Sequence, residues 1–98
     1  NKILTMNTAP SGESLRLDQC ARGATVRVTG LIDQPLFGAQ DERVALRLKE
    51  LGFLPGAPLK VIGFGLLGSD PLAVQVNGTK FALRRAEAAK ICVEPTQL

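Results

Sequence analysis

Alternating apolar and polar residues predict a series of short β-strands along most of the chain. Residues 24–30 read A-T-V-R-V-T-G, so Val26 and Val28 share one face of a strand. The same alternation predicts further strands at residues 59–64, 72–76, 79–83 and 91–94. Five short strands in a chain of 98 residues indicate a mainly β fold. We expect a small SH3-like β-barrel whose last strand closes the sheet.

The sharpest local signal is the pair Asn77-Gly78 between two of these strands. Both residue types tolerate a positive φ, which favours a two-residue type I′ turn. Such a turn fixes the pairing of the hairpin. Val74 is predicted to face Phe81 on the inner side, while Gln75 faces Lys80 on the outer side.

One segment, residues 41–51, has the apolar spacing of an amphipathic helix. Asp41 can cap its first turn, and Gly52 ends it. The residues expected to face the core are Val44, Leu48 and Leu51. Shorter helical turns are expected at residues 15–23 and 85–89. The fold therefore has one main helix.

An excess of apolar residues next to this helix predicts a protein-docking surface. Helical phase places Leu46 opposite the core-facing stripe, and Leu36 and Phe37 belong to an aperiodic loop before the helix. Arg43 and Arg47 could supply a polar rim. The alternative is that the loop folds back and buries Leu46 in a satellite core, which would leave no docking surface.

Length and composition indicate a single domain and argue against nucleic-acid binding and membrane insertion. Ninety-eight residues make one domain, which we place at residues 15–95, after a flexible tail at residues 1–14. The aromatic content is 4% and the net charge is +3, so neither stacking nor charge indicates a nucleic-acid-binding protein. No run of about 18 apolar residues is present, and we expect a cytoplasmic location.

No pattern of catalytic, cofactor-binding or metal-binding residues is found, and we expect no enzyme activity. The chain has no histidine, and Cys20 and Cys92 lie too far apart in sequence for a zinc motif, so two free thiols are expected. Residues 63–68 match G-x-G-x-x-G, but no helix follows to bind a pyrophosphate, so a loop at the rim of the barrel is expected.

The densest basic group in the sequence surrounds the end of the predicted hairpin. It consists of Lys80, Arg84, Arg85 and Lys90. These cations could form a docking patch for acidic protein or nucleic acid, or they could be a solvated strand end.

Three segments together resemble the FeoA family. They are L-K-E-L-G-F-L-P-G at residues 48–56, G-S-D-P-L at residues 68–72 leading to Asn77-Gly78, and A-L-R-R-A-E-A-A-K-I-C-V-E at residues 82–94. The resemblance implies an SH3-like barrel and a cytoplasmic accessory protein of bacterial ferrous iron uptake, a process that also involves transition metal ion binding. The implied partner is FeoB, a membrane transporter with a GTPase domain, whose activity the accessory protein modulates.

Two departures from the family pattern concern charge. The helix has Leu46-Arg47 where adjacent arginines are usual, and residues 63–67 lack basic residues. Two other functions remain open for a small barrel of this kind. One is the SH3-like regulatory domain of an iron-dependent transcriptional repressor, and the other is an RNA-binding module.

Overall fold

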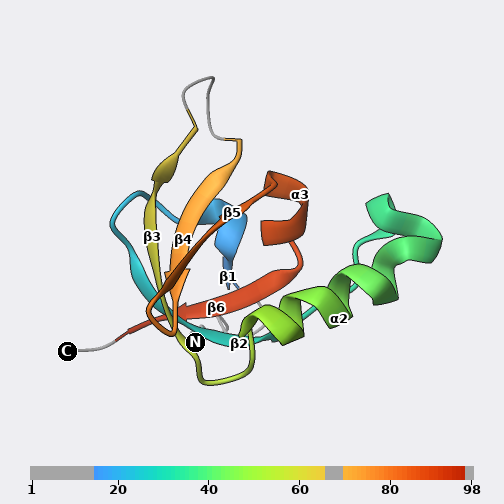
Figure 1. Cartoon of the computed structure of the whole chain (residues 1–98), viewed down its shortest axis with the longest axis horizontal. Coiled ribbons are helices and arrows are strands. Elements are labelled where there is room, and N and C mark those ends of the chain that lie inside the picture. Colours follow the sequence, from blue (N-terminus) through green and yellow to red (C-terminus); the bar gives the residue numbers. More distant parts are fainter. Residues whose placement is uncertain (1–14, 66–69, 97–98) are drawn as a thin grey trace, which may run out of the picture.

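The computed structural model describes residues 15–65 and 70–96, so the tail predicted at residues 1–14 lies outside the described part. The described strands are β1 (Leu15–Arg16), β2 (Thr25–Leu31), β3 (Pro58–Phe64), β4 (Leu72–Val76), β5 (Thr79–Leu83) and β6 (Ile91–Pro95). The described helical elements are η2 (Leu17–Gln19), η3 (Pro35–Gln40), α2 (Asp41–Leu51) and α3 (Arg85–Ala88). Figure 1 shows α2 and η3 extending to one side of the sheet.

The described strands form one antiparallel sheet in the order β1-β6-β2-β3-β4-β5. This confirms the mainly β fold with one main helix, although the described residues form six strands instead of five. The extra strand is β1, which pairs Leu15 with Val93 and Arg16 with Cys92. The expectation that the last strand closes the sheet is wrong, because β6 lies between β1 and β2 and does not pair with β5.

The hairpin of β4 and β5 has the predicted turn and register. Asn77 and Gly78 have φ values of 53° and 81°, as a type I′ turn requires. Val74 pairs with Phe81, and Gln75 pairs with Lys80. Because side chains alternate between the two faces, Val74 is buried while Lys80 is exposed. The local turn signal was therefore sufficient to set this part of the sheet.

The apolar core consists mainly of inward-facing side chains of the strands, and Leu48 of α2 belongs to it. Its largest side chains include Leu17, Leu48, Phe53, Leu59, Leu72, Leu83 and Ile91. Val44 and Leu51 pack against the same cluster, which confirms the predicted core-facing stripe of α2. The rings of Phe53 and Phe81 lie 6.0 Å apart between centroids and tilt by 53°, a favourable aromatic arrangement. Gly52, in the left-handed region at φ 112°, ends α2 as expected.

Three local predictions need correction. Residues 15–19 form β1 and the short η2, since Leu15 and Arg16 pair with β6, and Gly23 lies beyond η2 in a turn at φ 85°. The stretch predicted as an aperiodic loop, residues 31–40, contains the last residue of β2 and the 3-10 helix η3. Asp41 makes no capping hydrogen bond to α2, because its carboxylate is bound elsewhere.

None of the described helices has both the length and the apolar character needed to span a membrane.

Candidate partner-binding site

The candidate site lies on η3 and α2, which we call the η3–α2 arm. Pro35 occupies the start of η3, where its fixed φ suits a helical turn and its missing N–H costs no hydrogen bond. Gly38 adopts φ 54°, a value that breaks the 3-10 helix and lets the chain turn into α2. In α2, Asp41 and Glu42 stand in the first turn and Lys49 stands in the last, which suits the helix dipole.

A buried ion pair anchors the arm to the body of the domain. The Lys90 side chain is 1% exposed, and its Nζ donates to Asp41 Oδ1 at 2.6 Å and to the Ile32 carbonyl oxygen at 3.0 Å. The hydrogen bond from Lys90 is the main cause that lowers the pKa of Asp41 from its ordinary value of 3.8. Lys90 thereby links the start of α2 to the segment just before β6.

Gln34 adds a second link between the arm and the domain. Its backbone N–H donates to Asp41 Oδ1 at 3.0 Å, and its side-chain Nε2 donates to the Ala89 carbonyl oxygen at 2.8 Å. The first bond pairs the backbone N–H that precedes η3, and the second pairs the carbonyl at the C-terminal end of α3. The position of the arm is therefore set by polar contacts at its N-terminal end and by the apolar face of α2.

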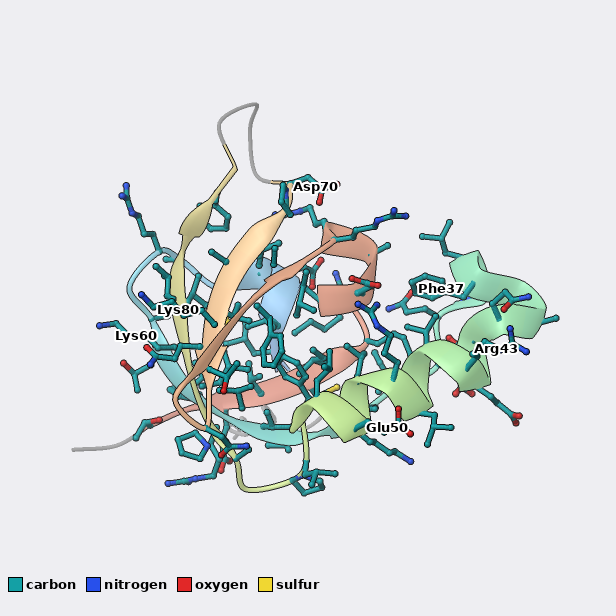
Figure 2. All side chains as sticks on the ribbon, in the orientation of Figure 1. Phe37, Arg43, Glu50, Lys60, Asp70 and Lys80 are labelled. Atoms are coloured by element: carbon teal, nitrogen blue, oxygen red, sulfur yellow. The ribbon has the colours of Figure 1, made fainter. Side chains whose placement is uncertain are left out.

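The structure exposes two of the three predicted apolar docking residues. Leu36 is 74% exposed and Leu46 is 57% exposed, whereas Phe37 is half-buried. In Figure 2 the Phe37 side chain points from η3 toward the body of the domain. The satellite-core alternative is wrong for Leu46, because neither η3 nor any other described element covers it. Burial of these exposed leucine side chains against a partner would be favourable, because it removes apolar surface from water.

The two predicted rim arginines differ in their surroundings. Arg43 is exposed, and no hydrogen bond or ion pair of its side chain is found within residues 15–65 and 70–96. It lies three residues before Leu46 and so borders that side chain on the helix surface. Arg47 instead pairs with Glu87 of α3, with Nη1 and Oε2 3.0 Å apart. Arg43 is therefore a neighbour of Leu46 on the surface of α2, whereas the side chain of Arg47 is bound to α3.

The basic group predicted around the end of the hairpin does not exist as a surface patch. Lys90 is buried against Asp41, and the half-buried Arg85 donates from Nη2 to the Asp18 carbonyl oxygen at 2.7 Å. Lys90 is the residue that sequence reasoning missed. A lone lysine within the apolar run A-A-K-I-C-V was the available signal, because a lysine is almost never fully buried unless it is paired.

The described residues form no disulfide and no candidate metal site. Cys20 and Cys92 are free and buried, as expected, and burial is the main cause that raises the pKa of the Cys20 thiol. No cluster of three or more cysteine, aspartate or glutamate side chains that could hold a metal ion occurs in residues 15–65 and 70–96. The loop expected at residues 63–68 falls partly outside the described residues, and its described part ends β3.

Comparison with known proteins identifies the family. Residues 15–95 match the FeoA domain. The chain belongs to the FeoA family. FeoA of Stenotrophomonas maltophilia, solved in complex with zinc, is 34% identical, with a TM-score of 0.70 over 83% of this chain and 91% of that one. That protein is described as a prokaryotic SH3 domain protein and a candidate activating factor for ferrous iron transport.

Two further solved structures extend the comparison. FeoA of Chlorobium tepidum is 34% identical, with a TM-score of 0.70 over 85% of this chain and 71% of that one. IdeR of T. acidophilum shares only the fold, at 18% identity and a TM-score of 0.67 over 85% of this chain and 34% of that one. The SH3-like fold expected from the sequence is confirmed. A search of curated proteins finds no match.

Proposed function

We propose that this protein is a cytoplasmic accessory protein of ferrous iron uptake, without enzyme activity of its own, that binds FeoB and modulates its activity. Membership of the FeoA family supports the link to iron transport. The described candidate activating role of the Stenotrophomonas maltophilia protein supports modulation of a transporter. Residues 15–95 would be the functional domain, with residues 1–14 as a flexible tail.

The observation that carries the proposal is the pair of exposed leucines on the η3–α2 arm. Leu36 and Leu46 are 74% and 57% exposed, although the arm itself is fixed by the buried Lys90–Asp41 pair. A rigid helix with apolar residues directed to solvent binds with little loss of conformational entropy. Arg43 beside Leu46 supplies the charged border that is common around such contacts. Phe37 and Arg47 would contribute at the edge of the same surface.

The proposal is tested by titrating the full chain into the purified cytoplasmic region of FeoB in a calorimeter, with and without GTP. We expect saturable binding and a changed rate of GTP hydrolysis by FeoB at saturation. The accessory protein alone should hydrolyse no GTP. Absence of binding at concentrations up to about 1 mM, which corresponds to only about 4 kcal/mol, would contradict the proposal.

A further inference from the structure

A second surface gathers basic residues that are dispersed in the sequence. Thr25 of β2 pairs with Lys60 of β3, Lys60 pairs with Gln75 of β4, and Gln75 pairs with Lys80 of β5. These four residues form one row across the outer face of the sheet. Figure 2 shows Lys60 and Lys80 on the side of the molecule away from Phe37 and Arg43, so this surface is separate from the η3–α2 arm.

A third cation, Arg22, lies beside the row. The turn that contains it is held against β3, because the N–H of Gly23 donates to the Val61 carbonyl oxygen at 2.8 Å. Arg22, Lys60 and Lys80 all line one hollow of about 380 Å³. On the other side of the Lys60–Gln75 pair lies a second hollow of about 230 Å³, lined by Thr25, Pro58 and Asn77 among others.

The charge of this face is not balanced by acidic residues. The four strands β2, β3, β4 and β5 contain no aspartate or glutamate. Arg27 of β2 pairs with Glu94 of β6, with Nη1 and Oε2 3.2 Å apart. For Arg22, Lys60 and Lys80, no hydrogen bond or ion pair of the side chain is found among the described residues. The face therefore presents three exposed cations around two joined hollows.

We propose that this face binds an extended acidic segment of a partner protein. Lys60 and Lys80 stand two strands, or about 10 Å, apart with Gln75 between them, so a chain that crosses the row at Gln75 has a cation on each side for its carboxylates. Alternate side chains of an extended chain are about 6.6 Å apart and point to the same side. The two hollows on either side of Lys60 and Gln75 give such a segment a path across the row.

The chemistry of the face favours a polypeptide over the other polyanions. The hollow with the three cations is lined by no aromatic side chain on which a nucleic-acid base could stack. Three cations are also fewer than the four to eight that are typical of segments bound to anionic membranes. The inference does not depend on the binding of FeoB.

The test uses the full isotopically labelled chain in an NMR titration. The probe is a capped synthetic peptide of about eight residues that alternates glutamate and threonine, because that spacing directs its carboxylates to one side. We expect saturable shifts of the amide signals of Arg22, Lys60, Gln75 and Lys80 at low ionic strength. Lys60→Gln and Lys80→Gln should each weaken binding about threefold, and the double variant about tenfold.

Lys49→Gln is the matched control, because Lys49 is an exposed lysine on α2 and its loss changes the net charge equally. This variant should bind like the wild type. Addition of salt should weaken binding of the wild type, since exposed charges are screened within about 10 Å at 0.1 M. A peptide in which glutamine replaces glutamate should not bind.

Three results would overturn the proposal. The first is the absence of saturable shifts up to about 1 mM peptide. The second is an equal loss of affinity in Lys49→Gln and Lys60→Gln, which would indicate a general charge effect. The third is tighter binding of single-stranded DNA or anionic lipid vesicles than of the peptide, lost in the same double variant, which would assign the face to a different polyanion.

Discussion

Lys90, just before β6, and Asp41, the first residue of α2, form a buried ion pair across 49 positions of the sequence, with Nζ and Oδ1 2.6 Å apart. A lysine that is 1% exposed has lost most of its hydration, and the additional hydrogen bond from the ammonium to the Ile32 carbonyl oxygen offsets part of that cost. The contact links the start of α2 to the segment before β6 and so holds the η3–α2 arm in position. Loss of either partner should therefore loosen the arm.

The Lys90→Met variant tests this anchor. The substitution keeps much of the buried aliphatic volume but leaves Asp41 and the Ile32 carbonyl without the ammonium. We expect the free energy of unfolding to fall by about 1 to 3 kcal/mol in urea melts. The exposed Lys49→Met should change it by less than about 0.5 kcal/mol. Equal stability of the two variants would mean that the buried pair contributes nothing.

The pH dependence of stability should report Asp41. Its pKa is lowered in the folded protein, so the unfolded chain takes up a proton first as the pH falls. The stabilising contribution is complete well above the ordinary value of 3.8 and is lost as the pH falls through the folded pKa. Asp41→Asn removes the titrating group. Its stability should therefore fall less between pH 7 and about pH 3 than that of the wild type.

The control for this measurement is Glu42→Gln, an exposed neighbour in the same helical turn. This variant removes one carboxylate of the same turn and leaves the Lys90–Asp41 pair intact. If Asp41→Asn and the wild type lose the same free energy of unfolding over this range, the pKa of Asp41 is not lowered by folding.

The hairpin makes a prediction about which substitutions destabilise the sheet. Val74 is fully buried, and its partner Phe81 contacts Phe53, so we expect Val74→Ala and Phe81→Ala to cost about 2 to 5 kcal/mol. Gln75→Ala and Lys80→Ala, on the outer face, should cost less than about 1 kcal/mol. Denaturant melts of the four variants measure this difference. Similar costs for all four would show that the register is different.

The sequence correctly predicted the elements whose geometry depends on residues close together in the chain. Asn77-Gly78 set the turn and register of the hairpin, and the apolar spacing of Val44, Leu48 and Leu51 set the length and buried face of α2. The exposure of Leu46 followed from the same helical phase. These predictions succeeded because neighbouring residues alone determine them.

The errors came from contacts that are distant in sequence. β1 has only two residues, too few for an alternating pattern, and it exists because β6 pairs with it. Nothing local places β6 between β1 and β2 instead of beside β5. The burial of Lys90 required a carboxylate 49 positions away, and the outer basic face required the pairing of three strands. Long-range pairing of this kind leaves no periodic signal in a single sequence.

The central claim, that the η3–α2 arm binds FeoB, is tested most directly by one comparison of dissociation constants. Leu46→Asp and Leu54→Asp each place a charge at an exposed leucine, 57% and 48% exposed respectively, but only Leu46 lies within the proposed surface. Both variants should melt within a few degrees of the wild type, because neither side chain belongs to the core.

Calorimetric titration into the cytoplasmic region of FeoB should then separate the two variants. We predict that Leu46→Asp weakens binding at least about tenfold, which is about 1.4 kcal/mol, because burial of the carboxylate against an apolar partner is unfavourable. Leu54→Asp should bind like the wild type. A Leu46→Asp protein that melts normally and binds FeoB with wild-type affinity would contradict the account.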